Sequence, residues 1–156
     1  MTTTLEHSPA DIVRQLLIDL GLGANGGVSW PVYASNEPSS NNSDVPDALI
    51  VVTDTASRKE GRSQVSGQLF QHYGVQILVR HPTHKVGFLK ASAIERTLAE
   101  NVNRQSVSLA AAVGETTDTY LVYSLSVNPL LVLGKGPDNN LSFFSLNAFV
   151  SLRQTA

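Results

Sequence analysis

One stretch of the chain changes its hydrophobic period midway, and this change constrains the fold more than any other feature. In residues 74–81 the apolar side chains recur at every second position, which is the period of a strand with one fully apolar face: Val75, Ile77 and Val79. Leu78 makes the second face partly apolar, so we expect this strand inside a sheet and not at its edge. Pro82 ends the strand, because proline removes a ladder donor and restricts the residue before it.

From Thr83, which we take as a helix N-cap, the period becomes helical. We expect the apolar residues at this spacing to face the sheet: Val86, Leu89, Ala93, Thr97, Leu98 and Val102. The charged residues fall elsewhere and are expected to face water: Lys90, Glu95, Arg96 and Glu100. A core strand therefore leads directly into an amphipathic helix that packs on it.

A second helix is predicted near the start of the chain, at Ser8-Pro9-Ala10-Asp11. This run combines a hydroxyl N-cap, a proline at the first helical position and an acid in the first turn. An apolar stripe follows in residues 12–20, and Gly21 ends the helix. Residues 1–7 before it are expected to form a flexible N-terminal arm that includes His7.

Other segments are predicted to be extended because their apolar residues alternate or run continuously: residues 28–34, 48–53, 64–70, 106–113, 119–127 and 141–152. Pro31 places the first of them at a sheet edge or a strand start. The continuous apolar run in residues 48–53 indicates burial on both faces. Residues 72–74 are expected to turn into the central strand, and the segments 35–47 and 134–140 are predicted to be loops.

Together these elements predict an α+β fold in a single domain of 156 residues. We expect one mixed, mostly antiparallel sheet with two amphipathic helices packed on one face. The opposite face then needs another cover, polar side chains or a neighbouring subunit. Only 15% of the residues are charged, which suggests that much of the surface meets other protein.

The composition also argues against several classes of function. A net charge of -2 disfavours a dedicated nucleic-acid binder, which normally carries a basic patch. The chain has no cysteine, and therefore no disulfide framework, thiolate nucleophile or Cys-type zinc site. Its first residues do not resemble a signal peptide, and its apolar runs are far shorter than a membrane span.

We find no pattern of residues that calls for an enzyme or a cofactor. His81 and His84 are three apart, but Pro82 lies between them and no acid or cysteine nearby completes a metal site. Gly134-Lys135-Gly136 lacks the spacing of a phosphate-binding loop and its Ser or Thr. No Gly-x-Ser-x-Gly elbow is present to position a nucleophile.

The most charged segment of the chain contains Arg58, Lys59, Glu60 and Arg62. It is either a solvated hairpin tip or a protruding arm that contacts a partner, since charged loops on a rigid sheet often carry recognition. We take these four residues, with Lys135 in the later loop, as the candidate partner contacts.

A succession of short motifs resembles the small minor capsid or tail terminator proteins of long-tailed bacteriophages. Its most similar part is a Gly-Val-Gln-Ile-x-Val-Arg run followed by Gly-x-x-Lys-Ala in a helix, at residues 74–80 and 87–91. The run of apolar residues at 48–53 and the closing segment at 144–149, which contains Asn147, are also similar. The resemblance spans about residues 9 to 152, and none of its motifs is a catalytic signature.

The resemblance implies a non-enzymatic virion protein, made in the bacterial cytoplasm, that forms a hexameric ring at the head-proximal end of the tail tube. Such a ring stops tube polymerisation and joins the tail to the connector or head-completion protein, with DNA passing through its lumen without sequence-specific binding. Two other hypotheses remain open. The chain is either another neck component, or a small cytosolic binding domain or enzyme with a ligand pocket near His81 and His84.

Overall fold

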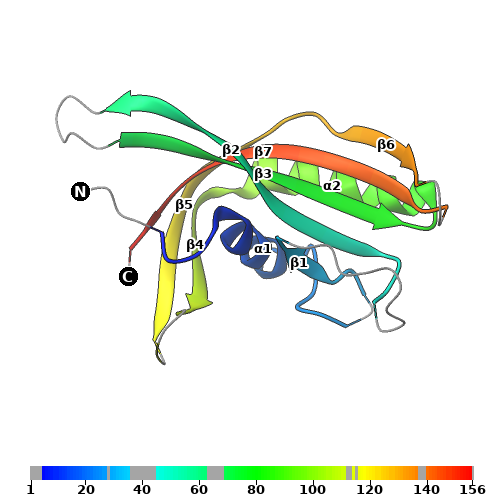
Figure 1. Cartoon of the computed structure of the whole chain (residues 1–156), viewed down its shortest axis with the longest axis horizontal. Helices are drawn as coiled ribbons and strands as arrows, with labels where there is room; N and C mark the ends of the chain where they lie inside the picture. The colour runs from blue at the N-terminus through cyan, green and yellow to red at the C-terminus, as the bar shows by residue number, and fades with distance from the viewer. Residues whose placement is uncertain are drawn as a thin grey trace.

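The computed structural model describes residues 5–27, 29–35, 45–62, 69–111, 114, 116–136 and 140–155. Within them the chain forms two helices and seven strands (Figure 1). In chain order these are α1 (Pro9–Asp19), β1 (Val32–Ala34), β2 (Leu49–Arg62), β3 (Leu69–His81), α2 (His84–Asn101), β4 (Asn103–Ala110), β5 (Thr117–Val127), β6 (Leu131–Lys135) and β7 (Ser142–Gln154).

All seven strands belong to one sheet, in the order β1-β2-β3-β7-β5-β4, with β6 also paired to β7. Only β1 runs parallel to its neighbour, and the other pairs are antiparallel. The strand that contains Ile77 lies between β2 and β7, as its apolar pattern predicted. The predicted class, an α+β fold with one mixed and mostly antiparallel sheet, is confirmed.

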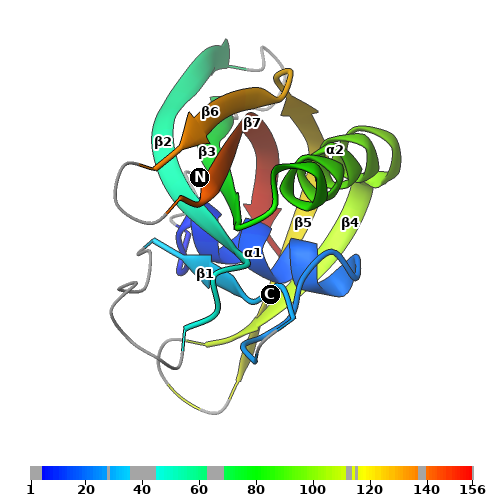
Figure 2. The same ribbon diagram turned by 90° about the vertical axis from the view of Figure 1, so that its right-hand side faces the viewer.

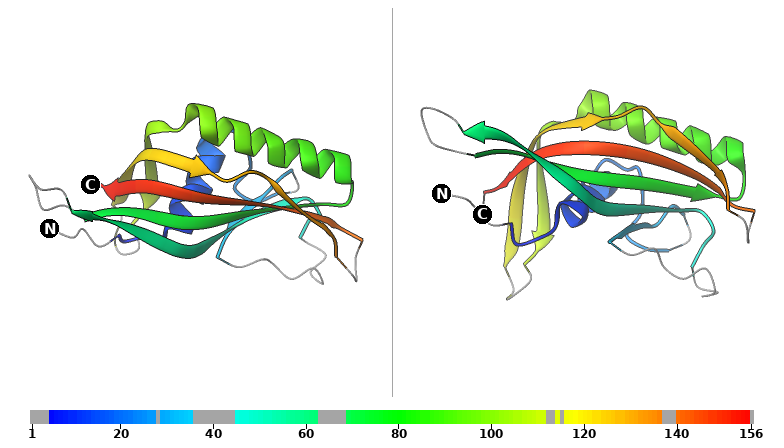
Figure 3. Two further views of the ribbon diagram at one scale, coloured as in Figure 1. Left: turned by 90° about the horizontal axis from the view of Figure 1, so that it is seen from above. Right: turned by 45° about the horizontal axis from the view of Figure 1, so that its top comes forward.

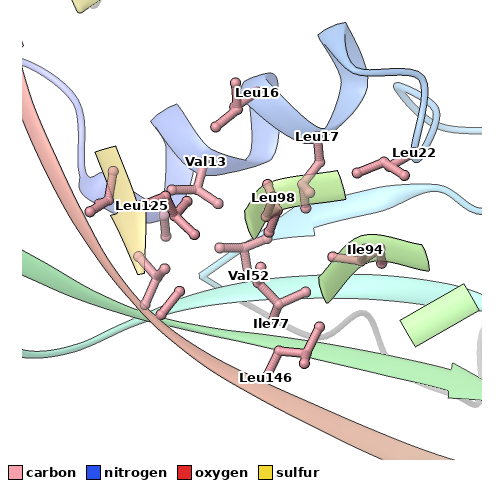
Figure 4. Close-up of a cluster of buried hydrophobic side chains, with 14 of the residues drawn as sticks. Val13, Leu16, Leu17, Leu22, Val52, Ile77, Ile94, Leu98, Leu125 and Leu146 are labelled. Atoms are coloured by element: carbon pink, nitrogen blue, oxygen red, sulfur yellow. The ribbon is translucent and has the colours of Figure 1, made fainter. Parts of the chain in front are cut away.

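Both helices pack against the same face of this sheet. Figure 4 shows leucines and a valine of α1 and the α2 residues Ile94 and Leu98 meeting over Val52, Ile77 and Leu146 of three adjacent strands. All of these side chains belong to one buried cluster. Helix α1 contacts both β2 and β4, which lie far apart in the strand order, so the sheet curves around it (Figure 2). The predicted placement of the helices is therefore correct.

The face that α2 turns to the sheet differs from the predicted one. The buried residues of the helix are Gly87, Ala91, Ile94 and Leu98. Val86 and Leu89, which we expected inside, are 42% and 57% exposed. The small residues on the buried face allow the helix to approach the sheet closely. Large apolar residues therefore do not mark the buried face of this helix. Thr83 is the N-cap as predicted, but its side chain makes no capping hydrogen bond.

The start of the chain behaves as its capping residues predict, but not as a free arm. Ser8 Oγ accepts a hydrogen bond from Asp11 N–H (3.2 Å), and Gly21 follows α1 with a φ of 73°. His7 is held on the sheet, contrary to our expectation: its Nε2 donates to Ala110 O (2.9 Å) and its Nδ1 lies 2.7 Å from Tyr120 Oη. Residues 1–4 of the expected arm lie outside the described residues.

Strands β2 and β3 are longer than predicted and form a hairpin that projects past both helices (Figure 3). We call residues 54–62 and 69–74 of this hairpin the β2–β3 arm. The expected turn at residues 72–74 is wrong, because β3 runs through it and pairs with β7 from Tyr73. Gly74 is needed for close approach and not for a turn, since a side chain there would meet the carbonyl oxygen of Ala56 at an irregularity in β2.

Two later segments also differ from the prediction. Gly134 and Lys135, expected in a loop, close strand β6, which pairs with the start of β7. In β5 an irregularity between Val122 and Ser124 brings Leu125 to the buried side with Tyr120 and Val122, which simple alternation along residues 119–127 does not predict. The closing strand β7 keeps the predicted alternation, with its even-numbered residues from Phe144 to Leu152 buried.

Candidate interaction surfaces

The five residues predicted to contact a partner do not lie together. Arg58, Lys59, Glu60 and Arg62 are in β2, on the β2–β3 arm, and the residues that connect the two strands, 63–68, lie outside the described residues. Lys135 ends β6, which lies at the opposite end of the sheet from the arm (Figure 1). If these residues contact partners, they contact them at two separate places.

The base of the arm is tied to the neighbouring strand β7. The guanidinium carbon of Arg58 lies 4.4 Å from the centre of the Phe149 ring, which is a cation–π distance. A hydrogen bond of 2.7 Å joins His72 Nδ1 and Ser151 Oγ. Arg58 therefore supports the arm in addition to exposing its charge. His72 lies in strand β3, whereas we predicted a turn residue.

The sheet face turned away from the helices is divided into a buried and a more open part. Arg80 is only 2% exposed there, and its Nε and Nη2 donate to the carbonyl oxygens of Asp47 and Pro46. Further along β3 and β7, Gln76 Nε2 donates to Ser145 Oγ (2.8 Å). Next to it Asn147 is exposed and Phe149 is half-buried. This second part is a polar surface with aromatic residues, which suits contact with protein.

His81 and His84 do not converge on a common site. The Nδ1 of His81 accepts a hydrogen bond from Thr83 N–H (2.9 Å), and its ring stacks on Trp30 at 5.2 Å between centroids. His84 instead packs against Phe88 and Phe144, at 6.4 and 5.3 Å. Among the described residues, no group of three or more His, Cys, Asp or Glu side chains could hold a metal ion.

The structure adds a lysine to the surroundings of His81. Lys90 Nζ lies 5.3 Å from the centre of the Trp30 ring, and partial burial lowers the pKa of its amine. Trp30 has a φ of 52°, which is unusual for a bulky residue. The sequence placed Lys90 in solvent, and only the packing of α2 beside the loop before β1 brings it to this ring.

Several exposed apolar side chains on β6 and the first half of α2 were not expected from the sequence. With exposed fractions of 41 to 57%, they are Val86, Phe88, Leu89, Leu131, Val132 and Leu133. Leu131 pairs with Ser145 and Val132 with Phe144, so these two neighbouring side chains point to opposite faces of the sheet. The apolar run at residues 129–133 was the available signal, but it has no alternation that would assign it to a strand.

Strand β6 and helix α2 are joined through one buried side chain. Phe144 of β7 is fully buried and pairs directly with Val132. On the helix side its ring centre lies 6.3 Å from that of Phe88. Glu95 of α2 also accepts a hydrogen bond from the backbone N–H of Leu130 (3.2 Å), just before β6. Strand β6 and the first half of α2 are therefore held together around the Phe144 ring.

No protein-family model matches the sequence. No curated protein matches it either. Within the described residues, neither helix has the length and apolar character needed to cross a bilayer.

Proposed function

We propose that this chain is a structural virion protein of a long-tailed bacteriophage. Six copies of it form a ring at the head-proximal end of the tail tube. The ring terminates tube polymerisation and joins the tail to the connector or head-completion protein. The proposal starts from the resemblance over residues 9–152, whose most similar part is the β3–α2 unit at the centre of the fold.

The observation that carries the proposal is the sheet itself, which is covered by helices on one face only. Its other face carries polar residues and half-buried aromatics, its β2–β3 arm projects past the helices (Figure 3), and β6 lies at its edge. A subunit of a closed ring needs two different surfaces that meet head to tail. A sheet with exposed ends and one uncovered face supplies such surfaces.

The test is deletion of the gene in the phage that encodes it. Loss of a tail terminator leaves tube growth unchecked, so electron micrographs should show overlong tails that are not attached to heads. Tails of normal length beside leaking heads would reject this function in favour of a head-completion or connector protein. Adjacent genes for a tail tube protein and a tape measure would give independent support.

A second candidate function rests on the Trp30, His81 and Lys90 group. A partly buried lysine with a lowered pKa beside an aromatic ring and a histidine is a feature of some ligand-binding and catalytic sites. A ligand-binding domain would stay monomeric and bind a small molecule with a signal that Lys90→Met removes. A ring that forms without such binding would exclude it.

A further inference from the structure

Two exposed arginines lie over aromatic rings on the sheet face that is turned away from the helices. The guanidinium carbon of Arg58 lies 4.4 Å from the centre of the Phe149 ring, and that of Arg153 lies 5.5 Å from the centre of the Tyr123 ring. The even-numbered residues of β7 from 144 to 152 are buried, so the side chains of Phe149 and Arg153 point to the other face. We call Arg58, Tyr123, Phe149 and Arg153 the arginine–aromatic surface.

These four residues come from strands that are adjacent in the sheet, and the contacts between the strands make the surface continuous. Arg58 of β2 pairs with His72 of β3, and a hydrogen bond of 2.7 Å joins His72 to Ser151 of β7. Ser151 lies between Phe149 and Arg153 on the same side of β7, where every second residue is about 6–7 Å further along the strand. The next strand, β5, supplies the tyrosine beside Arg153.

Among the described side chains of the strands, the charges on this face are positive. Strands β3, β4, β6 and β7 contain no Asp or Glu. Asp54 of β2 is on the helical side, where its Oδ1 accepts a hydrogen bond from Ala10 N–H of α1 (2.8 Å). Asp118 of β5 is on that side too, because it pairs with Leu109, which packs against the buried cluster. The arginine–aromatic surface therefore favours an anionic partner, although the whole chain has a net charge of -2.

Carboxylates on a protein suit this surface better than the phosphates of a nucleic acid. Contact with a ring restricts the guanidinium without satisfying its N–H donors, so less side-chain freedom is lost when these donors bind carboxylate oxygens in pairs. Arginine, tyrosine and phenylalanine are enriched in protein–protein interfaces. Nucleic-acid binding instead depends on many cations that neutralise several phosphates, whereas this surface offers two arginines in a chain of negative net charge.

A second copy of this chain is a poor source of these carboxylates, because most of those described already have a partner within the chain. The carboxylates with such an internal contact are Asp11, Asp19, Asp54, Glu95 and Asp118. The remaining ones, Glu6, Asp47 and Glu100, come from three different segments, before α1, before β2 and near the end of α2. A different protein is therefore the better occupant.

We infer that the arginine–aromatic surface binds another protein through carboxylate groups of that protein. Arg58 and Arg153 bind the carboxylates, and the two rings add apolar contact between them. This inference goes beyond the proposed function and does not depend on it, because it rests on the contacts and charges of a single chain.

The experiment measures binding of labelled poly-L-glutamate to the purified chain by fluorescence anisotropy. An uncharged Gly-Ser polymer of the same length is the control probe. Arg58→Gln and Arg153→Gln each remove one positive charge from the surface, and the matched control Arg96→Gln removes the same charge from an exposed position on α2. Circular dichroism and thermal melts establish that each variant is folded, and ¹H–¹⁵N NMR spectra locate the residues that contact the probe.

We expect poly-L-glutamate to bind, to shift the NMR signals of residues 149–153, and to bind more weakly as the NaCl concentration rises. Arg58→Gln and Arg153→Gln should each weaken binding by about fivefold or more, the level that marks an energetically important interface residue. Arg96→Gln should change it by less than about twofold, since an exposed charge on another face is screened. No binding, shifts on another face, or an equal loss in Arg96→Gln would overturn the inference.

Two further outcomes would replace the occupant and so overturn the inference as well. Tighter binding of a single-stranded oligothymidylate to the same residues would assign the surface to nucleic acid. Self-association of the chain alone that Arg153→Gln abolishes, seen by size-exclusion chromatography with light scattering, would assign it to a second copy.

The proposed function is tested separately by the deletion phage. Overlong tails in that phage, together with no binding of poly-L-glutamate, would keep the terminator function and reject this surface. Tails of normal length, together with binding that depends on Arg58 and Arg153, would reject the function and keep the surface.

Discussion

Replacing Gly87 by alanine tests the closest contact between α2 and the sheet. A Cβ at this position would lie 2.6 Å from Cε2 of Phe144 and 3.1 Å from Cβ of His81. Phe144 of β7 is fully buried and lies against α2 at Gly87, so its ring has little room to move. The added methyl group must therefore displace the ring or lift the helix.

Two opposing effects set the size of the change. Alanine favours a helix over glycine by up to about 1 kcal/mol. Overpacking a well-filled core costs about 1–3 kcal/mol. We expect the second effect to prevail and Gly87→Ala to lower the free energy of unfolding by about 1 kcal/mol, which in a domain of this size lowers Tm by about 2–4 °C.

Urea denaturation and thermal melts followed by circular dichroism measure this difference. Ala99→Gly is the matched control, because Ala99 is an exposed residue of the same helix and reports the propensity effect alone. If Gly87→Ala is more stable than the wild type by the amount that Ala99→Gly loses, the helix does not touch the sheet at this point. The packing described above would then be incorrect.

Three further predictions follow from other parts of the fold. Ile77→Asp should prevent folding, because Ile77 is fully buried in the central strand and an unpaired carboxylate there is costly; a soluble variant with native circular dichroism would contradict the packing. Reversing Arg58, Lys59 and Arg62 to Glu should leave Tm within a few degrees and weaken binding to purified tail tubes, and unchanged binding would assign the arm no contact role. Burial raises the pKa of Tyr120 above its ordinary value of 10.0, so the stability that its protonated form contributes is complete below pH 10 and is lost as pH rises through the folded-state pKa. Tyr120→Phe should therefore lose less stability than the wild type in alkaline melts, and an equal loss would exclude this residue as the cause.

The elements with strong local patterns were predictable from the sequence. Ser8-Pro9 marks the start of α1 and Gly21 marks its end, because capping and backbone freedom depend on the residues themselves. The alternation in β3 and β7 assigned their buried faces correctly, because successive strand residues point to opposite sides whatever their neighbours.

The errors occurred where a distant part of the chain decides the local structure. From the sequence, Gly74 indicates a turn, but in the fold it allows the irregular part of β2 at Ala56 to approach β3 closely. The charged residues near Arg58 left a hairpin tip and a protruding arm open, and pairing with β3 places them in a strand of the arm. The helix α2 buries Gly87 and Ala91 because it must lie close to Phe144, so its exposed apolar residues resemble a core face when only the sequence is considered.

The sequence by itself determined the fold class, the central strand–helix unit and the start of α1, since each depends on period and capping over a few neighbouring residues. The tertiary structure decided which apolar residues remain exposed, because exposure depends on what packs above each side chain. For that reason Leu131, Val132 and Leu133 appear as an unassigned apolar run in the sequence and as an uncovered edge beside Phe88 in the folded chain.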